Sequence, residues 1–446
     1  MKELTIIGGG LAGCEAAWQA ANRGAKVRLY EMRPKVQTAV HQTGDLAELV
    51  CSNSLKSNSL DKATGLLKWE MRELDSLIIS CADASAVAAG SALAVDRAKF
   101  AGEITSRLQN HPNIEIMRDE LKAVPDSPCI VASGPLSSPS LADSIGEILG
   151  GDWLNFFDAV APIVDADTLD FEKLFLASRY EKGDAAYWNS ALDEAKYDEL
   201  RDAILTAEKA DAHNEEDITY FESCLPIEEM ARRGRLTMRY GALRGAGLTD
   251  PKTGRWPFAC VQLRAENLEG TMYNLVGFQT RLKWPEQTRV LRILPGLENV
   301  EIVRFGVIHK NIFINSPQVL NATFATKARA DLFFAGQLTG VEGYVESAAA
   351  GLMAGINAAR VLEEKEPLVF PRETVLGSLA HYITHAEAKT FQPMNSNWAL
   401  LPPLPETHLP AINGQKPKKI PKADKPPMFV ARAQKAFAEF RKSSPE

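Results

Sequence analysis

The chain has 446 residues, of which 45% are hydrophobic and 24% are charged, and its formal net charge is −7. This length suits two or three domains, and the composition is that of an ordinary globular protein. The negative charge excludes a generally basic nucleic-acid binder, although a local basic surface is compatible with it. Six cysteines without a C-x-x-C pair argue against a disulfide framework or a zinc site, so we predict no metal.

The N-terminus and the apolar runs indicate where the protein resides. The first predicted strand begins near residue 3, which leaves no room for a signal or transit peptide. The longest uncharged run of mostly small residues, 84–95, is too short to span a bilayer. We therefore expect a cytoplasmic protein without a membrane segment.

A strand, a glycine-rich turn and a helix open the chain. An apolar strand at 4–7 is followed by Gly8, Gly10 and Gly13 with G-x-G-x-x-G spacing, and then by a helix over 11–23. These glycines permit a tight turn, close approach of the backbone to a pyrophosphate, and close packing of helix on strand. The helix N-terminus attracts phosphate. The pattern predicts a dinucleotide site, with a plain structural turn as the alternative.

The next elements continue an α/β unit. A second apolar strand, 27–30, ends on Glu31, which is placed to accept a hydrogen bond from an adenosine ribose. The small polar stretch CSNSLKSN, 51–58, resembles neither a core strand nor a core helix, and is either a loop beside a cofactor or a surface loop. Asp96 is predicted to cap a helix that ends near 108. Strands at 114–117 and 129–132 follow, and the second runs into Ser133-Gly134-Pro135.

From about residue 152 the composition changes. An aromatic and acidic segment leads to a charged helical stretch at 198–217 and then to short alternating runs typical of strands. Residues 241–247, GALRGAG, have neither a clear preceding strand nor a following helix, so they do not predict a second dinucleotide fold. We expect 155–300 to be a separate inserted domain.

The nucleotide-binding pattern then returns. A strand at 332–335 leads to Gly336, a loop with Gly340 and Gly343, and a small-residue helix at 345–362. Two distant half-sites of this kind favour tightly bound FAD over NAD, and a helix packed closely on a sheet is the structural alternative. The predicted fold class is α/β: a Rossmann-like FAD-binding domain built from 1–154 and 301–446, with an inserted α+β domain at 155–300.

The C-terminal tail is basic. Residues 415–446 carry nine Lys or Arg against three acidic residues, and the end, FVARAQKAFAEFRK, predicts a basic amphipathic helix. Such a tail is either a solvated end or a nucleic-acid contact.

Cys224 is followed by the arginines 232, 233, 235, 239 and 244. Nearby guanidinium groups lower the pKa of a thiol and also suit phosphate recognition. From the residues alone, Cys224 is either a core residue or a nucleophile, and the arginines form either a salt-bridged surface or a phosphate contact.

Segments spread over nearly the whole chain resemble one enzyme family. They are IIGGGLAGCEAAWQAANRGAKVRLYEMRP, ELVCSNSLKSNSL, ESCLPIEEMARRG, FFAGQLTGVEGYVESAAAGLMAGINAAR and FQPMNSNWALLPPL. They are similar to the folate- and FAD-dependent tRNA (uracil-5-)-methyltransferases, TrmFO, with the longer GidA-type tRNA-modifying flavoproteins as a related family. The resemblance implies FAD, 5,10-methylenetetrahydrofolate as carbon donor, NADPH or NADH as reductant, and 5-methyluridine in the T-loop of tRNA as product, without an obligate protein partner.

The resemblance also implies roles for the two cysteines. Cys224 is the candidate nucleophile toward uracil C6, and Cys51 is a second catalytic candidate with a general-base or flavin-shielding role. The candidate cofactor-binding residues are Gly8, Gly9, Gly10, Leu11, Ala12, Gly13, Glu31, Arg33, Asn53, Gly336, Gln337, Gly343 and Tyr344. The candidate RNA-binding residues are Arg232, Arg233, Arg235, Lys418 and Lys419.

Three alternatives remain open on the sequence. The chain could modify the tRNA wobble uridine as GidA-like proteins do, methylate a ribosomal RNA uridine, or carry FAD as an RNA-binding scaffold without turnover. No folate motif is visible. His381, His385 and Trp398 are candidates for ring stacking or carboxylate contact with folate, with ordinary packing as the alternative.

Overall fold

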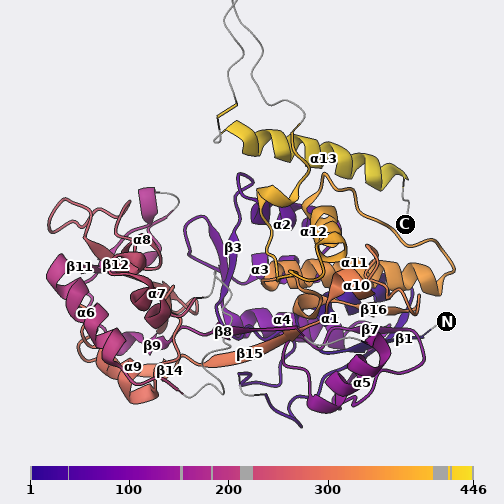
Figure 1. The fold of residues 1–446 in the computed structure, drawn as a ribbon, viewed down its shortest axis with the longest axis horizontal. Coiled ribbons are helices and arrows are strands. Elements are labelled where there is room, and N and C mark those ends of the chain that lie inside the picture. Colours follow the sequence, from indigo (N-terminus) through magenta and orange to yellow (C-terminus); the bar gives the residue numbers. More distant parts are fainter. Residues whose placement is uncertain are drawn as a thin grey trace, which may run out of the picture.

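The computed structural model describes residues 3–38, 40–150, 154–181, 184–210, 225–404, 420–421 and 424–443. Figure 1 shows two halves side by side, a larger one on the right that holds both chain ends and a smaller one on the left formed by the middle of the chain. We call them the nucleotide-binding half and the inserted half. No helix in the described ranges is both long and apolar enough to cross a membrane.

A parallel sheet of five strands forms the centre of the nucleotide-binding half, in the order β16-β7-β1-β2-β6. Its strands are β1 (Glu3–Ile7), β2 (Lys26–Tyr30), β6 (Ile114–Met117), β7 (Cys129–Val131) and β16 (Leu332–Phe334). Strand β16 pairs with β7 although some 200 residues separate them, Phe333 lying opposite Ile130. The predicted Rossmann-like sheet built from both ends of the chain is therefore confirmed.

Helices cover this sheet on both faces, as expected for a parallel sheet. The helices of this half, some of which form an outer layer, are α1 (Leu11–Asn22), α2 (Ala63–Arg72), α3 (Leu77–Ala84), α4 (Arg97–Gln109), α5 (Pro139–Leu149), α10 (Ser316–Val319), α11 (Tyr344–Leu362), α12 (Val375–His385) and α13 (Lys425–Ser443). The Asp96 carboxylate accepts from Lys99 N and caps α4, as predicted.

Helices α1 and α11 pack unusually closely because α11 has glycines where it meets α1. A Cβ at Gly351 would lie 2.1 Å from the Ala12 carbonyl oxygen, and one at Gly355 would lie 2.5 Å from that of Ala16. The two helices run parallel, so both N-termini lie at the carboxyl edge of the sheet, where α/β folds bind ligands. The small residues of α11 thus serve tight packing and site placement together.

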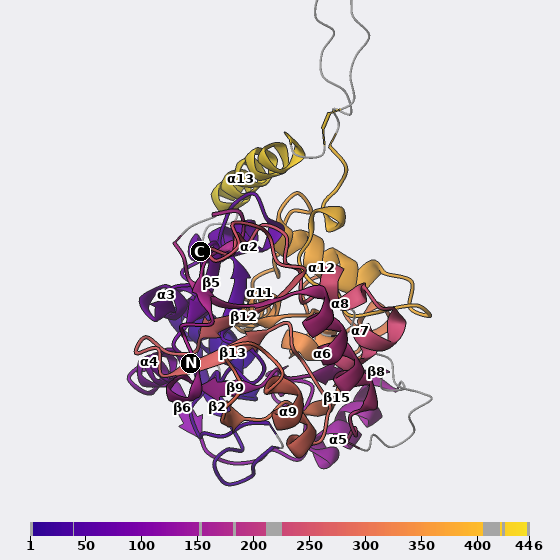
Figure 2. The same cartoon turned by 90° about the vertical axis from the view of Figure 1, so that its left-hand side faces the viewer.

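The inserted half has its own sheet and hydrophobic core. Six antiparallel strands in the described ranges have the order β10-β11-β12-β13-β9-β14. They are β9 (Ile163–Asp165), β10 (Phe175–Leu176), β11 (Tyr187–Leu192), β12 (Ala259–Ala265), β13 (Met272–Val276) and β14 (Ile302–Arg304). The helices are α6 (Glu194–Thr206), α7 (Ile227–Arg233), α8 (Thr237–Tyr240) and α9 (Trp284–Leu291), and Figure 2 shows α6, α7 and α8 gathered on one side of β12 and β13.

One prediction about this half is wrong in detail. The charged helix expected at 198–217 is α6, which begins at Glu194 because the Asp193 carboxylate caps it by accepting from Lys196 N, and which ends at Thr206. Residues 211–217 of that prediction lie outside the described residues. The exact division of the chain at 154/155 and 300/301 stays a prediction. Strand β14, at Ile302–Arg304, belongs to the second sheet.

Two small sheets lie where the halves meet. Strands β8 (Leu154–Ala159) and β15 (Ile308–Phe313) form an antiparallel ribbon, and β3 (Ser54–Ser57), β5 (Ala92–Val95) and β4 (Ala86–Val87) form the other. The stretch 51–58 is therefore not wholly a loop as we expected. Its second half, β3, pairs with β5 across a register shift, and Lys56 has a φ of 61° there. Because this strand is irregular, its sequence lacks the apolar alternation that would predict a strand.

The C-terminal helix α13 packs on the nucleotide-binding half, above α2 and α12 in Figure 1. It buries Phe429, Ala433 and Phe437, and the Phe437 ring meets Trp69 of α2 with centroids 5.6 Å apart. The amphipathic helix expected at the tail is confirmed, but this part of the tail is a packed element rather than a solvated end.

Candidate cofactor-binding and active site

A cavity of about 380 Å³ opens at the carboxyl edge of the parallel sheet. Its walls come from the loops after β1, β2 and β7, from the loop before α11, and from the segment 50–56. Residues far apart in the sequence thus meet in one place, including Gly10, Glu31, Cys51, Gly336 and Tyr344.

The first glycine loop has the geometry of a phosphate site. Gly8 has a φ of +105°, and a Cβ at Gly13 would lie 1.8 Å from the Gly8 carbonyl oxygen, so the turn requires both glycines. A Cβ at Gly10 would meet no atom within 4 Å, so its bare backbone faces the cavity. Gly10 also begins α1 without any side-chain cap, which leaves the helix N-terminus open to an anion.

Glu31 is held at the end of β2 by three donors. Its Oε2 accepts from Gly9 N at 2.9 Å, and its Oε1 accepts from Arg33 N and Arg33 Nε, both at 2.9 Å. Burial alone would raise the pKa of this carboxyl, but the bonds and charge of Arg33 outweigh it, and the pKa lies below its ordinary value. Glu31 is thus an oriented carboxylate at the cavity wall with room on Oε2 for a second donor.

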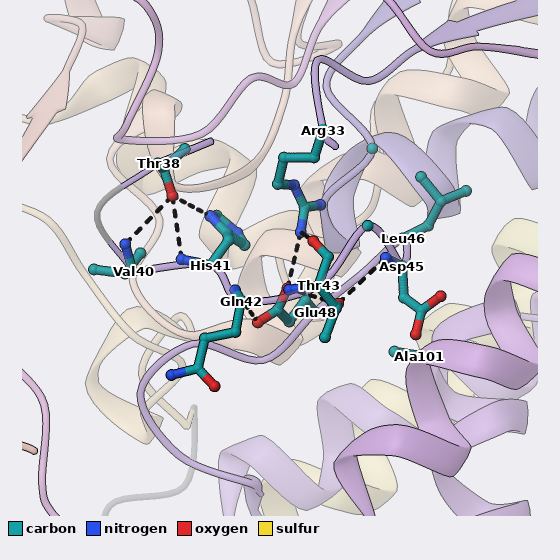
Figure 3. A network of polar contacts seen from close by, with 12 residues as sticks. Arg33, Thr38, Val40, His41, Gln42, Thr43, Asp45, Leu46, Glu48 and Ala101 are labelled. Carbon is teal, nitrogen blue, oxygen red and sulfur yellow. Dashed lines mark hydrogen bonds and ion pairs between the residues drawn. The ribbon is translucent and has the colours of Figure 1, made fainter. Parts of the chain in front are cut away.

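A loop that the sequence analysis did not single out completes this end of the cavity (Figure 3). The Glu48 carboxylate accepts from Arg33 Nη1, Gln42 N and Thr43 N at 2.9–3.0 Å. His41 Nδ1 lies 2.6 Å from Thr38 Oγ1, and burial with the nearby charge of Arg33 lowers the pKa of His41 to about 4. His41 is therefore a neutral wall residue at physiological pH.

The second glycine loop supplies the opposite wall. Gly336 and Gly343 have φ values of +77° and +115°, and Gly343 begins α11 without a side-chain cap. Gln337 Nε2 donates to Glu342 Oε2 at 2.7 Å, so one buried carboxylate fixes the loop between the glycines. The N-terminus of α11 thus has no side-chain cap, although its first turn carries the buried Glu346 carboxylate.

Cys51 and Tyr344 join the two loops. Tyr344 Oη accepts from Cys51 N at 2.7 Å and lies 2.9 Å from Cys51 Sγ. Burial raises the pKa of Tyr344 well above its ordinary value, so the phenol stays protonated. The Cys51 thiol is half-buried and lines the cavity.

The side chain of Asn53 links three segments of the chain, and its predicted contact with a cofactor stays a prediction. It does not line the cavity, and its Nδ2 donates to Val95 O and Ala265 O, while its Oδ1 accepts from Arg264 Nε. Arg264 also donates to Ser52 Oγ at 2.8 Å. Asn53 therefore connects the Cys51 segment to the inserted half.

Among the described residues, side-chain oxygens of Asn311, Glu346 and Ser138, at or near the cavity, are buried without a hydrogen-bond partner. Asn311 on β15 is 1% exposed and lines the cavity, and its Oδ1 accepts no bond. Glu346 Oε1 accepts from Lys56 Nζ at 3.0 Å and from Ser396, whereas Oε2 accepts no bond. A buried polar atom without a partner is costly. Nothing in the sequence singled out Asn311, because a lone Asn in a strand has no motif.

The predicted RNA-binding arginines are engaged with carboxylates. Arg232 and Arg233 contact Glu229, and Arg235 binds Asp198 and Glu194. All three are exposed, and their RNA contact stays a prediction. Cys224, Lys418 and Lys419 lie outside the described residues.

The folate candidates have packing partners. His381 and His385 stack on each other with centroids 4.1 Å apart, and Trp398 stacks on Phe429 of α13 at 5.4 Å. For Trp398, packing under the C-terminal helix accounts for the side chain.

The residues present fit FAD. The uncapped N-terminus of α1 and the open backbone at Gly10 suit a pyrophosphate, and Glu31 suits a ribose hydroxyl. Gly336 and Gly343, both with positive φ, line the opposite wall. The fold and the site define a flavin-binding protein of the Rossmann type.

Comparison with known proteins narrows this class. The model of the family described as "Glucose inhibited division protein A" matches residues 3–366. Methylenetetrahydrofolate–tRNA-(uracil-5-)-methyltransferase TrmFO of Exiguobacterium sibiricum is 56% identical over 91% of this chain and 93% of its own length. The TrmFO of Exiguobacterium sp. is 52% identical over 99% of both chains. The solved structure of Aquifex aeolicus GidA in its form II crystal has a TM-score of 0.67 and 18% identity, covering 99% of this chain and 74% of that one, which shows the same fold. The chain therefore belongs to the GidA family and, within it, to the TrmFO group.

Proposed function

We propose that this protein is an FAD- and folate-dependent RNA uracil-C5 methyltransferase. It forms 5-methyluridine in the T-loop of tRNA with 5,10-methylenetetrahydrofolate as carbon donor and NADPH or NADH as reductant, in the cytoplasm. The observation that carries the proposal is the cavity in which the two glycine loops meet Cys51 and Tyr344. The 52–56% identity to TrmFO proteins over most of the chain supports the substrate and the donor.

Bound FAD would supply reducing equivalents to the reaction. The chain's own part is to hold it: Gly8, Gly10 and the start of α1 bind the pyrophosphate, Glu31 orients the ribose, and Gly336 and Gly343 admit the ring system at the other end. Lys56, which lines the cavity and binds Glu346 at 3.0 Å, supplies a cation there.

Tyr344 positions Cys51. Because its hydroxyl accepts from Cys51 N, its own proton is available to Cys51 Sγ, 2.9 Å away. The pair can therefore hold or pass a proton at the Cys51 sulfur, in keeping with a general-base role, and the buried phenol keeps water from this side of the cavity. For Cys224, the resemblance supports attack of a thiolate on uracil C6, which makes C5 nucleophilic toward the one-carbon unit.

The test of the function is incubation of holoenzyme and unmodified tRNA with labelled methylenetetrahydrofolate and NADPH. We expect label as 5-methyluridine in the T-loop, located by mass analysis of tRNA fragments. Label at the wobble uridine, label only in ribosomal RNA supplied in parallel, or no transfer to RNA would each contradict the proposal.

The nucleophile has a separate test. RNA that contains 5-fluorouridine should form a covalent adduct with the wild-type protein, because C5 carries fluorine, which cannot leave as the C5 proton of uridine does. The adduct should vanish in Cys224→Ala. A matched Cys260→Ala variant, altered at a thiol buried in β12, should retain it. An unchanged adduct in Cys224→Ala would assign the nucleophile to another residue.

A further inference from the structure

The inserted half presents a surface on which exposed aromatic rings alternate with arginines. We call it the 180/256 patch, and its members are Tyr180, Arg239, Tyr240, Arg244, Arg255 and Trp256. Tyr180, Tyr240 and Trp256 are 50%, 70% and 57% exposed, which is unusual for such large rings. Arg239 and Tyr240 belong to α8, and β12 begins three residues after Trp256. Figure 1 shows α8 and β12 together in the upper part of the inserted half.

The patch is held in shape by its backbone. Tyr180 N donates to Gly247 O at 2.7 Å, and a Cβ at Gly247, which has a φ of +87°, would lie 2.8 Å from the Tyr180 ring. A Cβ at Gly245 would lie 2.1 Å from Pro257 O. Gly245 and Gly247 of the segment GALRGAG, 241–247, therefore allow the Tyr180 ring and residues 255–257 to lie directly on this segment.

The side chains of the patch contact one another through rings and guanidinium groups. The Tyr180 and Trp256 rings meet edge to face with centroids 6.3 Å apart, and Arg244 Nη2 donates to Tyr180 Oη at 3.2 Å. The Arg239 guanidinium lies 5.2 Å from the Tyr240 ring centroid and donates to the Tyr240 hydroxyl. Within the described part of the chain, Arg239, Arg244 and Arg255 form no ion pair with a carboxylate. In this they differ from Arg232, Arg233 and Arg235.

The local charge is opposite to that of the whole protein. Residues 239–256 contain four Lys or Arg and one acidic residue, Asp250, in a chain whose net charge is −7, and Glu181 beside Tyr180 is the exposed acidic neighbour of the patch. Asp250 is buried and its carboxylate accepts from Lys252 N. The exposed charge of the patch is therefore positive, which complements a polyanion.

We propose that the 180/256 patch binds the single-stranded loop of the RNA substrate, with Trp256 and Tyr240 stacking on bases and Arg244 and Arg255 contacting phosphates. This inference rests on the proposed function. Exposed aromatic rings interleaved with unpaired guanidinium groups are the chemistry by which proteins bind unstacked nucleotides. An acidic peptide would contact the arginines but would leave the three exposed rings without a stacking partner.

Strand β12 connects the patch to the candidate active site. Its first residue, Ala259, pairs with Arg244 beside the patch, and Arg264 near its end binds Asn53 and Ser52 next to Cys51. Seven extended residues span roughly 20 Å. RNA held on the patch is thus presented at a fixed distance from the cavity.

The proposal is tested by titrating full-length holoenzyme with an unmodified tRNA transcript and following fluorescence anisotropy at several KCl concentrations. Trp256→Ala and Tyr240→Ala should each raise the Kd by about fivefold to 150-fold, the effect of losing one stacked base. The double variant Arg244→Gln/Arg255→Gln should make the slope of log affinity against log salt shallower by about 1.4, because two phosphate contacts are lost. The aromatic variants should keep the wild-type slope.

Matched controls on the same half are Trp284→Ala and Arg292→Gln. Trp284 is 59% exposed and stacks on Phe305, and Arg292 is an exposed arginine at the end of α9. Both should leave the Kd and the salt slope unchanged, and bound flavin should be equal in all variants. Wild-type affinity and slope in the patch variants, or equal weakening in the controls, would overturn the inference.

The outcomes separate this inference from the proposed function. If the wild-type protein makes no 5-methyluridine but its tRNA affinity depends on Trp256 and Arg244, the proposed function fails and the patch stands. If 5-methyluridine forms with an unchanged KM for tRNA in every patch variant, the function stands and the patch assignment fails.

Discussion

At the scale of single residues, Glu31 shows how the chain prepares a carboxylate for a ligand. Gly9 N and two donors of Arg33 fix both of its oxygens, and Arg33 is in turn held by Glu48. The 38–48 loop therefore stabilises the position of Glu31 from behind, although it lies outside the glycine motif.

We expect Glu31→Gln to lower the affinity for FAD by about tenfold to hundredfold. The amide loses the negative charge that receives the ribose hydroxyl, and hydrogen bonds to charged groups contribute about 1.5–3 kcal/mol. The measurement is a flavin fluorescence titration of the flavin-free protein. The control is Glu3→Gln on the neighbouring strand, β1, where a half-exposed carboxylate binds Arg28. Equal FAD affinities for Glu31→Gln and wild type would contradict a ribose contact.

At the scale of elements, the pair α1 and α11 determines where the two half-sites meet. Gly351 and Gly355 remove the side chains that would separate these helices, so the loops that precede them approach within one cavity.

Replacing Gly351 by Ala should destabilise the fold by about 1–3 kcal/mol and reduce bound flavin, because the new methyl group overlaps the Ala12 carbonyl. Thermal unfolding and the flavin-to-protein absorbance ratio measure the two effects. Gly102→Ala is the matched control, since it lies inside α4 and its Cβ would meet no atom within 4 Å. That variant should gain roughly 0.5–1 kcal/mol. A stable Gly351→Ala variant with full flavin content would show that the helices can separate without harm.

The contact between Glu70 of α2 and the start of α12 makes stability depend on pH. The buried Glu70 carboxyl accepts from Val375 N and Leu376 N at the start of α12, and burial, only partly offset by these bonds, raises its pKa to about 8. Glu70 has a pKa of about 4.3 in the unfolded chain and about 8 in the folded protein. Between these two pH values Glu70 is protonated in the folded protein and ionised in the unfolded chain. The stability from this group is complete below the unfolded pKa and is lost as the pH rises through 8.

Glu70→Gln should therefore flatten the decline of stability from pH 5 to pH 8, where the wild type loses up to about 1.4 kcal/mol per pH unit from this group. Urea unfolding at pH 5, 6, 7 and 8 measures the difference between the two proteins. Glu73→Gln, at an exposed carboxylate that binds Arg441, should keep the wild-type pH profile. Parallel profiles for Glu70→Gln and wild type would show that Glu70 is ionised throughout.

At the scale of the whole molecule, buried polar groups couple the two halves. Arg97 of the nucleotide-binding half binds Glu266 of the inserted half and also donates to Leu49 O, two residues before Cys51. Although burial opposes the charge of Arg97, Glu266 raises its pKa above the ordinary value. With the Asn53–Arg264 contact, this pair holds the Cys51 segment between the halves.

Glu266→Gln should cost about 3–5 kcal/mol in the free energy of unfolding, since it leaves the Arg97 guanidinium buried without its carboxylate. Urea denaturation followed by both tryptophan and flavin fluorescence measures the loss. Glu269→Gln is the control at the same interface, because Glu269 meets Lys99 at 3.6 Å with both side chains more than half exposed. That exposed pair should contribute less than about 1 kcal/mol. Equal stabilities of the two variants would show that the Arg97–Glu266 pair does not couple the halves.

The sequence was sufficient to predict those features that depend on the residues of one short segment. The G-x-G-x-x-G turn, Glu31 at the end of β2, the Asp96 cap and the helix α11 were all predicted from the residues themselves, because turn geometry, capping and apolar periodicity act over a few positions. The same holds for the parallel sheet built from both ends of the chain, since two glycine-terminated strands indicate two half-sites.

Only the tertiary structure decided which distant residues meet. It placed Tyr344 beside Cys51, Arg264 beside Asn53, and Asn311 at the cavity wall. It also paired Arg232 and Arg235 with carboxylates, while Arg244 and Arg255 lie among exposed rings. The physical reason is that hydrogen bonds and ion pairs depend on distances of about 3 Å between atoms, and sequence spacing does not specify such distances across hundreds of residues.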